Sequence, residues 1–404
     1  MNKGIFAPAD ILLPRENFEK WSVIACDQYT SNPAYWDEVN RLTANAHSTR
    51  HLIYPEVYLG KSDAEAVTAS INRAMQDYLD SDVYEEYPDS LIYVERIQSD
   101  GALRQGLIGM VDLDEYDYNE GSTSRIRATE KTVLERIPPR VQIRKNAPTE
   151  LPHVLMLIDD GERAILEPLQ LLASEGKMQK IYDFDLMMDG GHLTGYLVPR
   201  EMNSRLCEAI EALGDKHDGI TLAVGDGNHS LATAKACRTI APTEINRYAL
   251  CEIVNIHSDS LVFEPIYRTV ENVDVDALFS AFLLFISNNM QTENKAQTIT
   301  FVTEKGREDI VVENPPHALA VGTVQIFLDS YLPTVPGAVI DYIHDEQELM
   351  SVITHGNACG FLYDCMGKSE LFDAVAREGV LPRKTFSMGH ARDKRYYTEV
   401  RKIK

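Results

Sequence analysis

Two side chains that can hold or move a proton lie in one short turn of this chain. Asp226 supplies a carboxylate and His229 an imidazole, and Ser230 follows directly. Gly225 and Gly227 flank the Asp, and glycine tolerates positive backbone angles and lets a ligand approach the backbone closely. A carboxylate beside a group that titrates near neutrality suits the removal of a proton from a hydroxyl that attacks a phosphate. The turn therefore predicts a site for phosphate chemistry.

The segments on either side place this turn at the start of a helix. Residues 220–224 form an apolar run typical of a strand buried on both faces, and residues 231–236 are good helix formers. The first N–H groups of such a helix, from Asn228 onward, lack internal partners and attract anions. An ordinary turn is the alternative, in which Asn228 or Ser230 caps the helix and His229 is only exposed to solvent.

The positive charges of this acidic chain are concentrated in two segments. The formal net charge is −23, yet residues 125–145 carry seven basic and two acidic residues, and residues 383–404 carry eight and two. Binding of DNA or RNA requires Lys and Arg to neutralise phosphates, so we expect no nucleic-acid partner. The two segments instead predict a pocket for a small polyanion, with Arg125, Arg140, Arg383 and Lys384 as candidate phosphate ligands. Solvated helix faces that pair with surface carboxylates are the alternative.

Alternating apolar patterns predict an α/β or α+β fold. Strands are expected over 90–97, 107–113, 153–158, 192–198, 248–256 and 260–263, and helices over 64–79, 274–290 and 370–377. Residues 297–302 and 309–313 flank Gly306 and predict a hairpin. Pro138 and Pro139 are expected to end any helix through 131–136 and to leave 140–144 extended or in a loop. We predict a core domain over 1–268 and a smaller α+β domain over 269–404, whose aromatic, basic C-terminal segment docks back on the core.

The turn resembles a known nucleotide-binding motif. Asp226, Gly227 and His229 match the Asp-Gly-His-His-Arg turn of the superfamily that contains the ParB-type nucleotide-binding domains, sulfiredoxin and the ADP-dependent free serine kinases. In that superfamily the turn grips nucleotide phosphates, and in the serine kinases its Asp activates the substrate hydroxyl. Asn228 stands where the motif has its first His, and Ser230 where it has Arg, which removes one charge that could neutralise phosphate.

Over its whole length the chain resembles the uncharacterised family called domain of unknown function 1015. The matching stretches are 8–11, 136–140, 182–185, 190–192, the Asp226 turn, 263–268 and 381–388. The resemblances imply a ParB- and serine-kinase-like core with a mixed sheet and flanking helices. Relatives carry a His-Glu pair where this chain has Thr129 and Glu130, so Glu130 is a candidate base or metal ligand, with a helix-surface Glu as the alternative. His192, after two glycines, and Arg268 are further candidate ligand contacts. For His192 the alternative is that it only starts a strand.

We therefore expect a small-molecule kinase or related phosphoryl-transfer enzyme, in which Asp226 accepts the hydroxyl proton. The expected cofactor is ADP or ATP with Mg²⁺ delivered by the nucleotide, without a metal site made by the protein alone. A non-catalytic nucleotide or metabolite sensor is one alternative, favoured by the replacements at Ser230 and Thr129. An NAD-type oxidoreductase is the other, because Gly225-x-Gly227-x-x-Ser230 approximates the dinucleotide-binding fingerprint.

The remaining expectations concern location and partners. No stretch approaches the roughly 20 apolar residues of a membrane span, and the first residues do not have the pattern of a signal peptide. Six scattered cysteines without a Cys-x-x-Cys pair predict reduced thiols. We expect a cytoplasmic protein with a small phosphorylated ligand and no membrane partner, and the sequence leaves a homodimer open.

Overall fold

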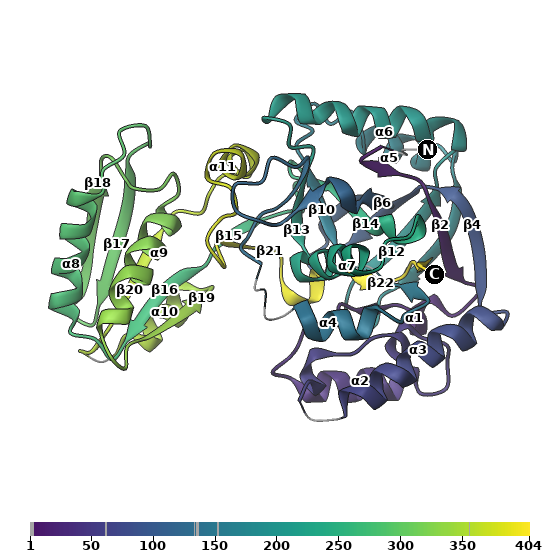
Figure 1. Cartoon of the computed structure of the whole chain (residues 1–404), viewed down its shortest axis with the longest axis horizontal. Coiled ribbons are helices and arrows are strands. Elements are labelled where there is room, and N and C mark those ends of the chain that lie inside the picture. Colours follow the sequence, from purple (N-terminus) through teal and green to yellow (C-terminus); the bar gives the residue numbers. More distant parts are fainter. Residues whose placement is uncertain (1–3, 61–62, 133, 135–136, 152, 355) are drawn as a thin grey trace. The chain divides into compact units, whose positions relative to one another are not determined.

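The computed structural model describes residues 4–60, 63–132, 134, 137–151, 153–354 and 356–404 (Figure 1). They form a mixed α/β fold, which confirms the predicted fold class, and they group into two compact units. The first unit is Met1–Leu261 with Gly389–Lys404, and the second is Val262–Met388. The sequence predicted two domains that divide after residue 268. Whether each part folds as a domain of its own is not decided by this grouping, so the predicted division stays a prediction.

The first unit is built on a mixed sheet, which has ten strands among the described residues. In sheet order the strands are β11 (Gln179–Asp185), β12 (His192–Leu197), β5 (Ile92–Ile97), β6 (Leu103–Asp112), β14 (Tyr248–Asn255), β10 (Leu155–Ile158), β13 (Leu222–Asp226), β8 (Ile126–Ala128) and β7 (Tyr116–Asp117), and β1 (Phe6–Ala7) also pairs with β6. The expected strands over 90–97, 107–113, 153–158, 192–198 and 248–256 are confirmed, with small shifts at their ends. The first residues of β13 are buried, as the apolar run predicted.

The C-terminal segment is tied into the first unit by short strand pairs. Strand β22 (Tyr396–Tyr397) pairs with β3 (Val23–Ile24), and β23 (Arg401–Lys402) pairs with β9 (Thr149–Glu150). A further pair joins β2 (Ala9–Pro14) to β4 (Tyr84–Ser90). Residues from both ends of the chain thus form one apolar cluster, which includes Trp21 and Val400.

The helices of the first unit correct one expectation. They are α1 (Phe18–Trp21), α2 (Pro33–Thr43), α3 (Ala64–Asp80), α4 (Ile137–Arg144), α5 (Glu167–Ser174), α6 (Asn203–Ala212) and α7 (Asn228–Ile240). The expected helix over 64–79 is confirmed as α3, and Asp63 caps it by accepting the amides of Glu65 and Ala66. The expectation that 140–144 is extended or a loop is wrong, because Pro138 lies in the first turn of α4, where a helix tolerates proline.

The second unit contains a five-stranded sheet with helices on both faces. Its strands and helices are β18 (Gly306–Val312), β17 (Gln297–Thr303), β20 (Ala358–Tyr363), β16 (Tyr267–Glu271) and β19 (Val339–Ile343) in sheet order, with α8 (Val275–Asn288), α9 (Ala320–Tyr331), α10 (Glu346–Val352) and α11 (Leu371–Glu378). Phe282 of α8 and Phe327 of α9 both contact Phe361, so these two helices cover one face. Leu349 of α10 packs with Leu362 on the other face.

Four expectations for the second unit can be compared with the structure. The helix expected over 274–290 is confirmed as α8. The hairpin turning at Gly306 and the helix that ends before Gly379 are confirmed. The strand expected over 260–263 begins only at Phe263, as β15 (Phe263–Pro265), which pairs with β21 (Phe386–Met388). Throughout the described ranges, no helix has both the length and the apolar character needed to cross a bilayer.

Candidate functional site

The ends of three strands bring the candidate residues to one edge of the first unit's sheet. Strands β8 and β13 run parallel, so their carboxyl ends meet at the same edge. Strand β10 runs antiparallel to β13 and begins where β13 ends, with Leu155 opposite Asp226. Glu130 follows β8 and His153 precedes β10, so both reach the neighbourhood of Asp226. Glu130 does not lie on a helix surface, so the alternative reading of this residue is wrong.

Gly227 makes the sharp turn from β13 into α7. Its φ of 83° lies in the left-handed region, and a Cβ at this position would lie 3.0 Å from Cα of Val154. Gly227 is itself the N-cap of α7, so neither Asn228 nor Ser230 caps the helix from outside as the alternative required. Gly225 lies within β13 without a positive φ, so the positive backbone angle expected of both glycines is found at Gly227 alone of the two. The first turn of α7 has no side-chain cap, an arrangement that favours anions.

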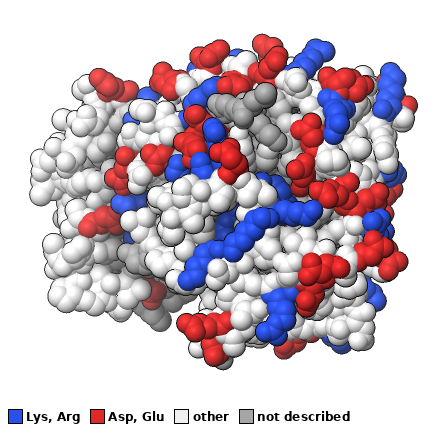
Figure 2. Space-filling view, turned by 45° about the vertical axis from the view of Figure 1, so that its right-hand side comes forward, with Lys and Arg blue, Asp and Glu red and all other residues white. Residues whose placement is uncertain are grey.

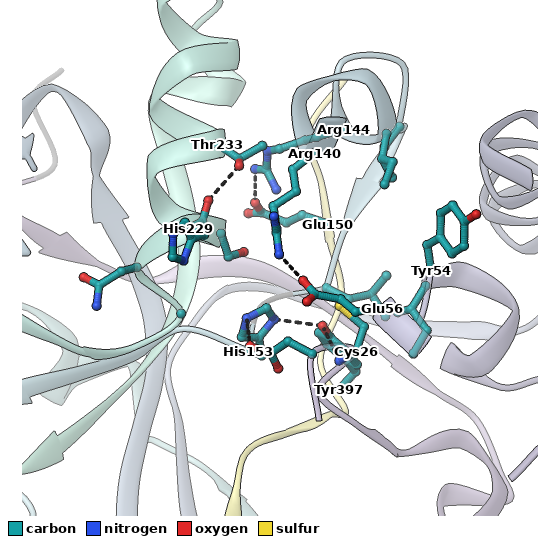
Figure 3. A pocket seen from close by; sticks show the side chains of 18 of the residues that line it. Cys26, Tyr54, Glu56, Arg140, Arg144, Glu150, His153, His229, Thr233 and Tyr397 are labelled. Carbon is teal, nitrogen blue, oxygen red and sulfur yellow. Dashed lines mark hydrogen bonds and ion pairs between the residues drawn. The ribbon is translucent and has the colours of Figure 1, made fainter. Parts of the chain in front are cut away.

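A cavity of about 490 Å³ opens in front of this turn. Its size falls within the range of about 300–1,000 Å³ typical of small-molecule sites. The cavity is lined by predicted residues from separate parts of the chain: Glu130, Arg140, Asp226, Gly227, Asn228, His229 and Ser230. Figure 3 shows the side chains of His229, Arg140, Glu56 and His153 around one common space. The structure therefore brings the turn together with arginines of the first basic segment, Arg140 and Arg144.

The Asp226 carboxylate is held by two donors. Its Oδ1 accepts the amide of Gly227 at 2.8 Å, and its Oδ2 lies 3.2 Å from Nζ of Lys394. Burial alone would raise the pKa of Asp226, but the charge of Lys394, the nearby His153 and the two hydrogen bonds hold that pKa below its usual value. Asp226 is therefore ionised at neutral pH, and 30% of its side chain is exposed.

Helix α4 directs two arginines at the cavity because it packs on α7. Ile137 and Val141, one turn apart, form a buried cluster with Ala232 of α7. Arg140 and Arg144 are likewise one turn apart on α4, and both line the cavity. The helical form of this segment, which the sequence did not predict, is therefore what brings both guanidinium groups to the site.

Carboxylates of the first unit pair with these arginines. Arg140 forms an ion pair with Glu56 and Arg144 with Glu150 (Figure 3). Glu150 also accepts Nε of Arg401 at 2.7 Å. Burial would raise the pKa of Glu150, but Arg401 and Arg144 lower it below its usual value, so this carboxylate also stays charged.

The charged lining of the cavity has more acidic than basic groups. The carboxylates are Asp27, Glu56, Glu130, Glu150 and Asp226, and the Lys and Arg residues are Lys131, Arg140 and Arg144. Figure 2 shows a band of Lys and Arg across one face, with Asp and Glu around it. The cavity is thus not a purely cationic anion site, and a phosphate bound there would face carboxylates as well as arginines.

Besides Gly225, which lies within β13, five predicted site residues do not line this cavity. Arg125 donates to Oε1 of Glu211 at 2.8 Å and to the carbonyl of the same residue at 3.0 Å. Arg268 belongs to the second unit, where its buried guanidinium donates to Oε1 of Gln325 and to main-chain carbonyls. Arg383 and Lys384 belong to the second unit too, and both cations lie over the ring of one tyrosine, Tyr342.

The fifth of these residues, His192 of β12, lies between two carboxylates of the neighbouring strand β11. Its Nε2 lies 2.6 Å from Oδ1 of Asp183, and its Nδ1 lies 2.7 Å from Oδ1 of Asp185. The hydrogen bond with Asp185 raises the pKa of His192, and Asp183 raises it further. Partial burial acts in the opposite direction but is the smaller effect. This environment explains the histidine as a surface residue held by two carboxylates, without any ligand.

We expect this histidine to make stability depend on pH. The pKa of His192 is higher in the folded than in the unfolded protein. Its contribution to the free energy of unfolding is therefore fully present below the pKa of the unfolded state, about 6.5, and is lost as the pH rises through the pKa of the folded state. The unfolding free energy of wild type minus that of His192→Gln should therefore be largest near pH 5.5, and, at this exposed position, below about 1 kcal/mol. Urea denaturation across pH 5.5–9 measures the difference. A difference that grows toward high pH would contradict the assignment.

Several residues at the cavity were not predicted from the sequence. His153 lies 2.8 Å from the hydroxyl of Tyr397 and also 4.0 Å from Oδ2 of Asp27. Burial, with Asp27 nearby, raises the pKa of the Cys26 thiol to about 12, so this cysteine stays protonated. The basic segment 383–404 predicted that cations from this part of the chain reach the site, but not that Lys394 is one of them. No sequence motif includes His153 or Tyr397.

The strand order contradicts the dinucleotide-binding alternative. A Rossmann unit joins two parallel strands through its helix. Here α7 leads from β13 to β14, and β10 lies between these strands, parallel to β14 and antiparallel to β13. Strands β13 and β14 are therefore antiparallel to each other, so the glycines at this turn do not belong to a Rossmann unit.

The fold and cavity define a mixed α/β protein with a candidate small-molecule site at a strand-to-helix turn. The chain belongs to the family described as "Protein of unknown function (DUF1015)", whose model matches residues 6–331. This match confirms the family resemblance inferred from the sequence. A comparison with curated proteins gave no significant match.

Solved structures give distant similarities. A conserved hypothetical protein from Pyrococcus furiosus is 11% identical, with a TM-score of 0.37, and the match covers 70% of this chain and 90% of that one. A free serine kinase in complex with AMP is 12% identical, with a TM-score of 0.38 and coverage of 72% and 92%. SbnI from Staphylococcus aureus, with a C-terminal truncation, is 12% identical, with a TM-score of 0.37 and coverage of 70% and 82%.

Proposed function

We propose that this protein binds a phosphorylated small molecule, preferably ADP or ATP, at the Asp226 turn and transfers a phosphoryl group to a hydroxyl acceptor. The observation that carries the proposal is the cavity in front of α7, where an uncapped helix start, an ionised Asp226 and two arginines of α4 face one space. Phosphoryl transfer depends mainly on positioning and on stabilising charge, and this lining offers groups for both.

Each group has a role that its environment supports. The amides of the first turn of α7 and the guanidinium of Arg140 would hold phosphate oxygens, because both are donors and Arg matches phosphate geometry. Asp226 would accept a hydrogen bond from the attacking hydroxyl. Its lowered pKa makes it a weak base, which suffices where the transition state is loose and the proton leaves late.

The donor chemistry of the cavity fits Mg²⁺ that arrives with a nucleotide. Asp226 and Glu130 supply the hard oxygen ligands that Mg²⁺ prefers, and both line the cavity. Within the described ranges, no three His, Cys, Asp or Glu side chains are grouped to hold a metal by themselves, so phosphates and water would complete the coordination. When bound, the ion would neutralise charge on the phosphates. It would also offset the surplus of carboxylates over Lys and Arg in the lining.

The experiment that tests the proposal is a thermal melt with ligands. At 100 times its dissociation constant a ligand adds about 2.7 kcal/mol, which should raise the melting temperature by about 5 °C or more. We expect this shift with ADP or ATP plus Mg²⁺. With the same nucleotide in EDTA we expect a much smaller shift, because five carboxylates then face the phosphates without Mg²⁺ to neutralise the charge. Inorganic phosphate and NAD serve as controls. Equal shifts with and without Mg²⁺ would contradict the metal's role, and no shift with any nucleotide would contradict the proposal.

A non-catalytic sensor is the second candidate, and the environment of Asp226 favours it. Both oxygens of this carboxylate already have donors, Gly227 and Lys394, so its capacity to take a proton is reduced. A protein that binds nucleotide with Mg²⁺ but forms no product with a panel of hydroxyl acceptors would be this sensor. Incubation with radiolabelled nucleotide and analysis of all labelled products separates the two candidates.

A further inference from the structure

A short chain of hydrogen bonds fixes the orientation of His153 at the cavity. The amide of Cys26 donates to the hydroxyl oxygen of Tyr397 at 3.2 Å, and the same hydroxyl lies 2.8 Å from Nδ1 of His153. The phenol is 2% exposed, and burial raises its pKa well above the usual value, so it keeps its proton. Two groups beside the hydroxyl could accept its proton, the thiol of Cys26 and Nδ1 of His153. A thiol sulfur is a weak acceptor and an imidazole nitrogen a strong one, so the phenol donates to Nδ1 of His153.

This arrangement selects one tautomer of the imidazole. A neutral histidine whose Nδ1 accepts a hydrogen bond carries its proton on Nε2. The Nε2 atom lies 4.0 Å from Oδ2 of Asp27, which is too long for a hydrogen bond, and His153 lines the cavity together with Asp226 (Figure 3).

We propose that His153 presents a fixed Nε2–H donor to an oxygen atom of the bound phosphorylated ligand, and that Tyr397 is the positioning residue that fixes the tautomer. This inference rests on the proposed function, because it names a ligand contact in the same cavity. It also assigns His153 a role opposite to that of a base, since the nitrogen that faces the ligand has no free lone pair. Proton acceptance in this part of the cavity is then left to the carboxylate of Asp226.

The tautomer can be measured directly. With ring-labelled histidine, the ¹³C and ¹⁵N shifts of each imidazole report which nitrogen carries the proton, and the signal absent from His153→Gln is that of His153. We expect the Nε2–H form in wild type near pH 7.5 and a mixture of tautomers in Tyr397→Phe, which retains the ring. The Nδ1–H form in wild type would overturn the inference, and so would an unchanged tautomer in Tyr397→Phe.

The ligand contact is tested by calorimetric titration with ADP and Mg²⁺. We expect His153→Ala to weaken binding about 10-fold or more, as for a hydrogen bond to a charged oxygen. His153→Gln retains an N–H donor of similar reach and should weaken binding by about 3-fold or less, on the same scale of hydrogen-bond strength. The matched control His257→Gln, at a histidine outside the cavity lining, should bind as wild type does.

The outcomes separate this inference from the proposed function. Equal affinity of wild type and His153→Ala would overturn the inference and leave nucleotide binding in place. Failure of wild type to bind ADP, ATP or phosphate would overturn both, whatever the tautomer. Thermal melts of each variant exclude unfolding as the cause of a loss, and His153→Gln keeps the test decisive if His153→Ala does not fold.

Discussion

Asp226→Asn is expected to reduce phosphoryl transfer by about 10²–10⁴-fold while nucleotide binding persists, the range found for loss of a positioned general base. Asparagine has nearly the same shape and can still accept the amide of Gly227, so the turn into α7 should survive. It cannot accept the hydroxyl proton, and it carries no charge for Lys394 or Mg²⁺. Single-turnover assays with saturating nucleotide measure the chemical step, and calorimetry measures the binding.

The control for this prediction is Asp215→Asn, which makes the same chemical change at an exposed position outside the cavity lining. It should leave turnover and binding unchanged.

The lowered pKa of Asp226 also predicts how activity and stability depend on pH. The ionised carboxylate, and the stability that it contributes, are fully present above the pKa of Asp in the unfolded chain, about 3.9. Both are lost only as the pH falls through the lower pKa of Asp226 in the folded protein. Activity should therefore not decline between pH 8 and pH 6 through protonation of Asp226. Equal turnover of Asp226→Asn and wild type would remove Asp226 from the chemistry.

The local pattern of the sequence was sufficient to predict the turn and its surroundings. An apolar run, Gly227 and a helix-forming segment define β13, the turn and α7, since each depends on neighbours in the sequence. The strand pairing could not be predicted in this way. That β10 lies antiparallel to β13, and so brings His153 to Asp226, depends on contacts between residues more than 60 positions apart.

Charge patterns predicted the participating segments but not which of their residues reach the cavity. Arg140 lines it because α4 packs on α7, whereas Arg125 of the same basic segment is bonded to Glu211. The proline pair was misread because the same residues that end a helix also suit its first turn. Lys394 reaches Asp226 only because the C-terminal segment is anchored by buried groups elsewhere in the first unit.

Arg96→Met is expected to lower the free energy of unfolding by about 3–5 kcal/mol, because four carbonyls each lose a buried donor at a cost of about 1 kcal/mol or more. Arg96 lies on β5 with 2% of its surface exposed, and burial, together with the charge of Arg104, lowers its pKa to about 9. Its guanidinium donates to the carbonyls of Gly190, Arg392, Asp393 and Lys394 and lies over the ring of Tyr396. Methionine fills much of the volume but leaves these carbonyls without that donor. Urea denaturation measures the loss.

The matched control is Arg205→Met, the same change at an exposed position of α6, which should alter stability by less than about 0.5 kcal/mol. The hydrogen bonds of Arg96 predict a second effect. Three of the four carbonyls that accept them belong to the C-terminal segment, and one of these is the carbonyl of Lys394 itself. Loss of Arg96 should free this segment before the rest of the unit unfolds, which separates Lys394 from Asp226 and moves the pKa of Asp226 upward. Hydrogen exchange should then accelerate first in residues 391–397. Uniform acceleration throughout the unit would mean that Arg96 stabilises the fold as a whole and does not specifically position Lys394.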